Sequence, residues 1–181
     1  RSGSVTETER FIARLQLDKS LIEDVFLIDA EGQIVIPAAD RAKGLSALSR
    51  DYFLAQQDAT DDRPYLSPVS RGRVTGKNQF RLSRRLTSAD GGFAGVVMIP
   101  VEPSAFSQHF KPFLTTSDSA AALLGTHDQL LRARTPEPND AAWQKPVQSK
   151  LWAALEKAPS GQFLSSGAVD AVERRKKKKK V

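Results

Sequence analysis

The sequence predicts an α+β protein of two tandem lobes, each an antiparallel sheet flanked by helices. Two observations support this prediction. Short apolar strands pair around turns at residues 25–36 and 79–101, with helical patterns before and between them. The strand–turn–strand pattern of residues 25–35 then recurs 96 residues further on, at 121–131. An internal repeat of this length indicates two copies of one α+β unit.

The first element is predicted to be a helix. Ser4 lies three residues before Glu7, which is the spacing of a capping box. Beyond them Phe11, Leu15 and Ile22 share one helical face. We therefore expect a helix from the N-terminus to Ile22.

Two hairpins are predicted next. The apolar run at 25–28 is typical of a strand buried on both faces, and 34–36 resumes as a strand after a turn that contains glycine. Residues 79–86 alternate with a period of two, as a half-buried strand does, and 93–101 return after a second turn. Together these runs predict a sheet of at least four strands.

The remaining elements follow from similar patterns. Arg81, Ser83 and Arg85 are expected on one face of their strand, with Arg84 on the other. The second lobe lacks an evident final strand. The further elements, in chain order, are a helix near 47–57, a connecting helix over 103–113, strands at 121–124 and 129–131, a helix from Pro146, and strands at 162–166 and 169–174.

Composition argues against catalytic and metal-binding roles. The chain has no cysteine, which excludes disulfides, thiolate zinc sites and cysteine nucleophiles. His109 and His127 are isolated in sequence, and no G-x-S-x-G elbow accompanies the serines. We therefore expect no catalytic residue, no metal and no cofactor, and a protein that is not an enzyme.

The positive charge lies in one place. The net charge of +6 is carried entirely by the terminal run from Glu173 to Val181, and the other 172 residues balance to zero. A nucleic-acid-binding fold needs basic residues spread over a face or groove, so nucleic acid is not the expected partner. Residues 176–181 are expected to be a disordered lysine-rich tail, or an addition made for expression.

Membrane spans are not evident in the sequence. No stretch approaches the roughly 18 consecutive apolar residues that a span requires, and no signal peptide opens the chain. The first residues, RSGSV, are expected to be a cut through a longer chain.

Five stretches follow one another between Val25 and Pro136: VFLIDAEGQIV, SRDYF, PYLSPV, FRLSRRL with DGGFAGVV, and LLRARTP. In this order they resemble the double Cache domains, which are tandem PAS-like extracytoplasmic sensors of bacterial histidine kinases, diguanylate cyclases and chemoreceptors. The resemblance implies a membrane-distal ligand-binding lobe over residues 23–113 and an incomplete membrane-proximal lobe over 114–175. Residues 1–22 would be the last turns of a long signalling helix that pairs in a homodimer.

The same resemblance implies a function. A small molecule bound by the distal lobe would send a signal to a cytoplasmic kinase or diguanylate cyclase. This portion would lie in the periplasm, and the full-length protein would be tethered in the inner membrane.

Candidate ligand-binding residues also follow from the resemblance. In amino-acid-binding members an arginine and an aromatic residue two positions on hold the ligand carboxylate, and Arg50 and Tyr52 stand at those positions. Tyr65 matches a tyrosine that faces the pocket. Ser83 or Arg84 is expected near the ligand, and the sequence leaves open which. A guanidinium fork with aromatic hydroxyls suits a carboxylate.

One departure from the family bears on the ligand. Amino-acid binders carry an aspartate on the last strand of the distal lobe to pair with the ligand ammonium group, and Pro100 stands at that position. A buried ammonium without a counter-charge costs several kcal/mol. We therefore expect a carboxylate or other small anion rather than an α-amino acid.

Structural roles remain open for all of these residues. Arg50 and the adjacent Asp51 could form a surface pair, and Tyr52, Phe53 and Tyr65 could be core packing. The basic cluster Arg71, Arg73 and Lys77 is interpreted as a solvated surface.

Two other functions also remain open. The chain could be a receptor lobe that binds a periplasmic protein and no small ligand. It could instead be a cytosolic PAS-like interaction domain, or a nucleic-acid binder that uses its lysine tail.

Overall fold

The computed structural model describes residues 2–22, 24–36, 44–158, 160–166 and 173–179. The chain divides into two compact units, Arg1–Ala105 and Phe106–Val181. The first lobe is predicted to end at residue 113, and the division between the units falls earlier.

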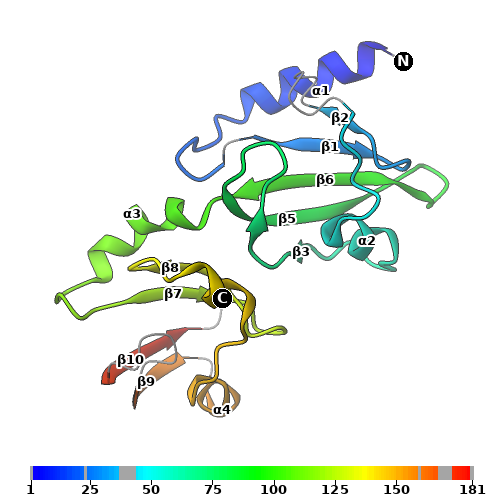
Figure 1. Ribbon diagram of the computed structural model, residues 1–181. Helices are drawn as coiled ribbons and strands as arrows, with labels where there is room; N and C mark the ends of the chain where they lie inside the picture. Colours follow the sequence, from blue (N-terminus) through cyan, green and yellow to red (C-terminus); the bar gives the residue numbers. More distant parts are fainter. Residues whose placement is uncertain (1, 23, 37–43, 159, 167–172, 180–181) are drawn as a thin grey trace. The chain divides into compact units, whose positions relative to one another are not determined.

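Unit 1 (Arg1–Ala105) is built on one antiparallel sheet, which runs in the order β2-β1-β6-β5-β3 with β4 also paired to β5 (Figure 1). Both predicted hairpins are confirmed, β1–β2 and β5–β6. The α+β class, with an antiparallel sheet and helices, is confirmed as well. The strands are β1 Phe26–Asp29, β2 Ile34–Ile36, β3 Tyr65–Leu66, β4 Ser70–Arg71, β5 Asn78–Thr87 and β6 Phe93–Val101.

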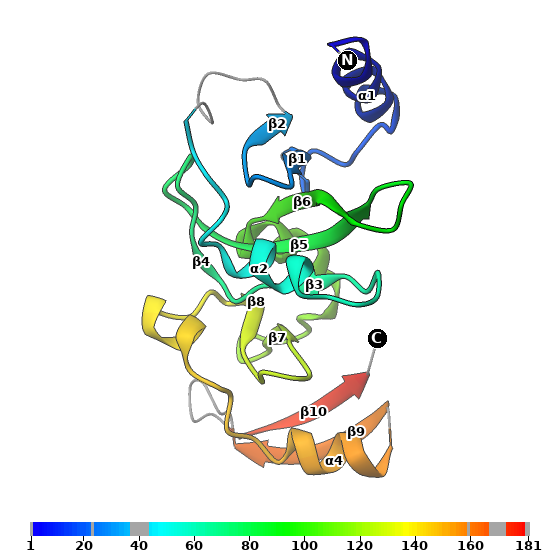
Figure 2. The ribbon, with the colours of Figure 1, turned by 90° about the vertical axis from the view of Figure 1, so that its right-hand side faces the viewer.

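Helix α2 (Asp51–Gln57) packs against the sheet and contacts β5 and β6 (Figure 2). Its buried Phe53 meets Phe93 edge to face, with ring centroids 5.4 Å apart. Ile28 and Val96 complete the centre of this core, and both are fully buried. The helix begins later than the predicted residue 47, because Arg50 before it is extended, with φ −92° and ψ 136°.

Strand β5 alternates as predicted. Arg81 and Ser83 are buried, whereas Leu82 and Arg84 face solvent. Because successive side chains of a strand point to opposite faces, this register decides which arginine reaches the interior.

Helix α1 (Ser2–Arg14) is shorter than predicted. The expected continuation to Ile22 is wrong, because Gln16 takes a left-handed φ of 46° that interrupts the helix, and the chain then turns around Asp18. The Asp18 carboxylate accepts hydrogen bonds from the backbone N–H and the hydroxyl of Ser20, at 2.9 and 2.6 Å. Such a local side-chain bond offers the backbone an alternative to the helix.

The described residues of unit 2 (Phe106–Val181) form two separate two-stranded sheets, β7–β8 and β9–β10. The predicted hairpin at 121–131 is confirmed as β7–β8, although its second strand starts only at Leu131. The helix expected from Pro146 starts at Leu151. The elements are α3 Phe106–Phe110, β7 Ala121–Leu124, β8 Leu131–Thr135, α4 Leu151–Lys157, β9 Ser160–Ser166 and β10 Glu173–Lys179, with 3-10 turns η3 Lys111–Phe113 and η4 Asp140–Gln144. A further 3-10 turn, η2 Pro103–Ala105, closes unit 1.

The lysine-rich end departs from the prediction. Lys176–Lys179 belong to β10, which pairs antiparallel with β9 from Glu173 opposite Ser166 to Lys179 opposite Ser160. The expectation of a disordered tail from residue 176 is therefore wrong for these four residues. Strand pairing uses backbone donors and acceptors, so a charged side-chain run does not prevent it.

None of the helices in the described part of the chain combines the length and the apolar character that a membrane crossing requires.

Candidate functional site

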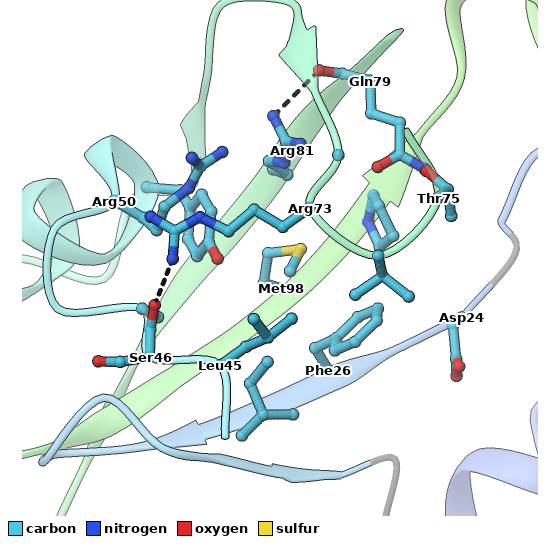
Figure 3. Close-up of a pocket in the computed structure, with 16 residues that line it drawn as sticks. Asp24, Phe26, Leu45, Ser46, Arg50, Arg73, Thr75, Gln79, Arg81 and Met98 are labelled. Atoms are coloured by element: carbon cyan, nitrogen blue, oxygen red, sulfur yellow. Dashed lines mark hydrogen bonds between the residues drawn. The ribbon is translucent and has the colours of Figure 1, made fainter. Parts of the chain in front are cut away.

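A cavity of about 150 Å³, partly open to solvent, lies in unit 1 (Figure 3). Cavities of this volume take a molecule about the size of benzene. Its floor is apolar. Phe26 of β1 and Met98 of β6 lie opposite each other in the strand register, and Ile34 and Leu45 extend the surface they form.

Arg50 and Tyr52 reach this cavity from the start of α2. The guanidinium carbon of Arg50 lies 5.7 Å from the centroid of the Tyr52 ring. Burial raises the pKa of Tyr52 above its ordinary value of 10.0, although the positive charges of Arg50 and Arg81 oppose the shift. The phenol is therefore protonated at neutral pH and available as a hydrogen-bond donor.

Arg81 reaches the cavity from the middle of β5 and is only 3% exposed. Its Nη1 donates to the Ser70 hydroxyl at 2.5 Å and to the Gln79 carbonyl at 3.2 Å. Both acceptors are neutral, and within the described residues no carboxylate forms an ion pair with Arg81. A buried charge without a counter-ion is costly.

Burial also lowers the pKa of the Arg81 guanidinium, and the neighbouring charges of Arg50 and Arg73 lower it further. All three arginines line the same cavity. The electrostatic state of this site therefore favours the arrival of negative charge.

Arg73 comes from the turn between β4 and β5. Its Nη1 donates to the Ser46 carbonyl at 2.9 Å, and its Nη2 to the Ser49 hydroxyl at 3.3 Å. These bonds tie the β4–β5 turn to the segment that leads into α2. Figure 3 shows the three arginine side chains gathered at one end of the cavity and Asp24 at the other.

Pro100 also lines the cavity, and it lies directly opposite Arg81 in the pairing of β6 with β5. A carboxylate at this position would therefore stand beside the Arg81 guanidinium. Proline supplies none, and although the Asp51 carboxylate acts to raise the pKa of Arg81, no carboxylate of the described residues forms an ion pair with it.

The other sequence-predicted site residues lie elsewhere. Tyr65 is half-buried against the core of unit 1, opposite Ser83 in the β3–β5 pairing. The Ser83 hydroxyl is buried and donates to the Tyr52 carbonyl at 3.0 Å. Arg84 is exposed and forms an ion pair with Asp62. The cavity lining thus includes Arg50 and Tyr52, and does not include Tyr65, Ser83 or Arg84.

Two arginines that line the cavity, Arg73 and Arg81, were not among the ligand-binding residues predicted from the sequence. Arg81 shares the inward face of β5 with Ser83, so the alternation predicted from the sequence could have pointed to it. Arg73 belongs to a basic cluster that is interpreted from the sequence as solvated surface. Arg73 is indeed exposed, yet it borders the cavity, and no local pattern distinguishes it from its neighbour Arg71.

No group of three or more His, Asp or Glu side chains placed to hold a metal ion occurs among the described residues. The chemistry on offer is anion binding by guanidinium groups and a phenol above an apolar floor.

Comparison with models of known protein families finds no match, and a search of curated proteins finds none either. Solved structures do match. The extracellular domain of rpHK1S-Z16, described as a histidine kinase, is 22% identical with a TM-score of 0.74; the match covers 96% of this chain and 78% of that domain.

Two chemoreceptor domains match more loosely. The ligand-binding domain of Pseudomonas fluorescens CtaA in complex with L-serine is 17% identical, with a TM-score of 0.54 and coverage of 92% and 77%. The domain of Pseudomonas aeruginosa PctC in complex with GABA is 16% identical, with a TM-score of 0.53 and coverage of 87% and 65%. This chain therefore has the fold of the extracellular sensor domains of histidine kinases and chemoreceptors.

Proposed function

We propose that this chain is the extracytoplasmic ligand-sensing part of a bacterial membrane receptor, and that its cavity binds a small anion. The observation that carries the proposal is Arg81, a buried cation in the cavity wall with neutral hydrogen-bond partners. An anionic ligand would supply the ion pair that Arg81 lacks among the described residues. Arg50 and Tyr52 would orient the anion from the start of α2.

The receptor context is supported by the fold that this chain shares with the extracellular sensors described above. In this proposal unit 1 is the membrane-distal PAS-like lobe and unit 2 the membrane-proximal one. Helix α1 would continue a longer signalling helix that pairs in a homodimer, and the output would be a cytoplasmic kinase or diguanylate cyclase. The domain itself would carry out no catalysis.

The ligand class is proposed from the charges. The solved chemoreceptor domains hold L-serine and GABA, which are zwitterions. Here Pro100 stands beside Arg81 and provides no partner for an ammonium group at that end of the cavity. We therefore favour an anion without an α-ammonium group.

A thermal-shift screen of the chain against small carboxylates, inorganic anions and amino acids tests this proposal. A ligand at 100 times its Kd stabilises a protein by about 2.7 kcal/mol. For a chain of this size that corresponds to roughly 5–10 °C.

Variants locate the site. The shift is expected in the wild type and to disappear in Arg81→Met and Arg50→Ala. Arg84→Gln is the control, because Arg84 is an exposed arginine on the other face of β5, and it should keep the shift. Anion-induced stabilisation that persists in both pocket variants, or a screen in which no anion stabilises the chain, would exclude an anion site in this cavity.

A further inference from the structure

We propose that the ligand of this cavity carries two acidic groups on a short carbon skeleton, and that Arg73 recognises the second of them. This inference rests on the proposed anion-sensing function. It goes further because it states the charge of the ligand. It also assigns to Arg73, in the turn between β4 and β5, the role of selecting ligands with two acidic groups.

The charge of the lining is the first argument. Its described residues include three guanidinium groups, Arg50, Arg73 and Arg81, and one carboxylate, Asp24. A ligand with one negative charge would leave an excess positive charge in a half-enclosed space. Two negative charges balance the lining. Because charges interact strongly where water is partly excluded, this difference favours the dianion.

The hydrogen bonds of the arginines are the second argument. Arg73 and Arg81 donate to hydroxyl and carbonyl oxygens of Ser46, Ser49, Ser70 and Gln79, and in the described part of the chain neither pairs with a carboxylate. Hydrogen bonds to a charged acceptor are roughly twice as strong as those between neutral groups. Both arginines would therefore form stronger hydrogen bonds to an acidic group of the ligand than to their present neutral acceptors.

The position of Asp24 is the third argument. Asp24 lies just before β1, and its carboxylate accepts the Val25 N–H at 2.8 Å. Strand β6 lies between β1 and β5. Two strand spacings, about 9.6 Å, thus separate the Asp24 end of the cavity from the strand that carries Arg81. Repulsion by Asp24 holds both acidic groups of the ligand at the arginine end, so the two groups must be close together.

The apolar floor is the fourth argument, and it concerns the skeleton. Phe26 and Met98 line the space between the arginines and Asp24 (Figure 3). A linear dicarboxylate places methylene groups on this surface, whereas inorganic phosphate leaves it uncovered. The cavity volume of about 150 Å³ suits a molecule of this size.

Isothermal titration of the full chain with linear α,ω-dicarboxylates, from malonate to adipate, tests the inference. Each diacid is compared with its monoamide, which has the same length and one charge fewer. We expect the best diacid to bind at least tenfold more tightly than its monoamide. Arg73→Gln should remove most of this preference and leave monoamide affinity within about twofold.

Arg71→Gln is the matched control, since Arg71 is exposed in the same segment but does not line the cavity, and it should keep the preference. Equal affinities for diacid and monoamide, both lost in Arg81→Met, would overturn the two-charge inference and leave the anion sensor intact. Tighter binding of inorganic phosphate or of an ω-amino acid than of any diacid would also overturn it. No binding by any anion would contradict the proposed function itself.

Discussion

Arg81 combines two properties that rarely occur together, deep burial and a charge without an ionic partner in the described structure. The residue opposite it explains this combination. Position 100 lies beside Arg81 across the β5–β6 pairing, so its side chain decides whether the guanidinium is neutralised by the protein or by a ligand. Proline adds no charge, and in the proposed function the ligand takes this role.

The substitution Pro100→Asp tests this reasoning directly. The new carboxylate should pair with Arg81 and compete with a bound anion, so anion affinity should fall at least tenfold, which is about 1.4 kcal/mol. Pro100→Ala, which adds no charge, should bind nearly as well as the wild type. Isothermal titration measures both. Equal losses in the two variants would mean that proline shapes the pocket rather than leaving Arg81 uncompensated.

The buried phenol of Tyr52 makes the folding stability of the chain depend on pH in the alkaline range. Its folded-state pKa lies above the ordinary value of 10.0 because the phenol is buried. Below pH 10 the phenol is protonated in both states, and the stability is fully present. As pH rises above 10 the unfolded chain loses its proton first, so stability falls.

The wild type should therefore match Tyr52→Phe in the pH dependence of its stability up to about pH 10 and lose stability relative to it above that pH. Urea unfolding of both proteins at several pH values below and above this pH measures the difference, and lysine titration affects both alike. Parallel stability curves would show that the environment of Tyr52 is the same in the folded and unfolded states.

At the scale of residues, the sequence pointed to two of the side chains that line the cavity. Arg50 and Tyr52 were identified from a resemblance in the SRDYF stretch, and both line the cavity. Local sequence could not decide between the two faces of β5 for the ligand, because the inward face depends on which side α2 covers. The exposed Arg84 and the buried Arg81 differ by tertiary packing alone.

At the scale of elements, the site depends on α2 being held against β5 and β6. Phe53 is the centre of this contact, fully buried and edge-to-face with Phe93. The helix has only seven residues, which is too short to be stable without tertiary packing.

Phe53→Ala should therefore destabilise the chain by about 3–5 kcal/mol. Leu54→Ala is the control on the same helix, because Leu54 is 43% exposed, and it should change stability by no more than about 0.5 kcal/mol. Urea unfolding reports both values. Similar losses in the two variants would mean that α2 buries a different face.

Elements with a clear apolar period were predicted well, and those governed by local polar bonds or backbone pairing were not. The two hairpins of unit 1 follow from runs such as residues 93–101. The end of α1 depends on the left-handed backbone at Gln16 and the Asp18 turn after it, neither of which an apolar pattern predicts. Strand β10 depends on pairing with β9, and its lysines resemble a tail.

At the scale of the whole molecule, the basic residues Arg174–Lys179 belong to the folded part of unit 2, because they lie in β10. Hydrogen exchange followed by mass spectrometry should show slow exchange for peptides covering Glu173–Lys179 and Ser160–Ser166, because their backbone groups are paired. Exchange of the first segment at the rate of an unstructured peptide would contradict the pairing and restore the sequence-based expectation of a disordered end.

The cavity lies entirely within unit 1. All the residues that line the cavity belong to unit 1, so a bound anion should protect this unit first. The repeat that predicted two lobes is visible in the β7–β8 hairpin of unit 2. The separation of unit 2 into two small sheets was not predictable from that repeat, since it depends on pairings beyond residue 160.

A crystal structure of the chain grown with the tightest-binding small carboxylate tests most directly whether this cavity holds an anion against its arginines. The expected result is a carboxylate within hydrogen-bond distance of Arg50 and Arg81, with the carbon chain over Phe26 and Met98. An empty cavity, or a carboxylate bound only at an exposed arginine such as Arg84, would contradict the proposed anion site.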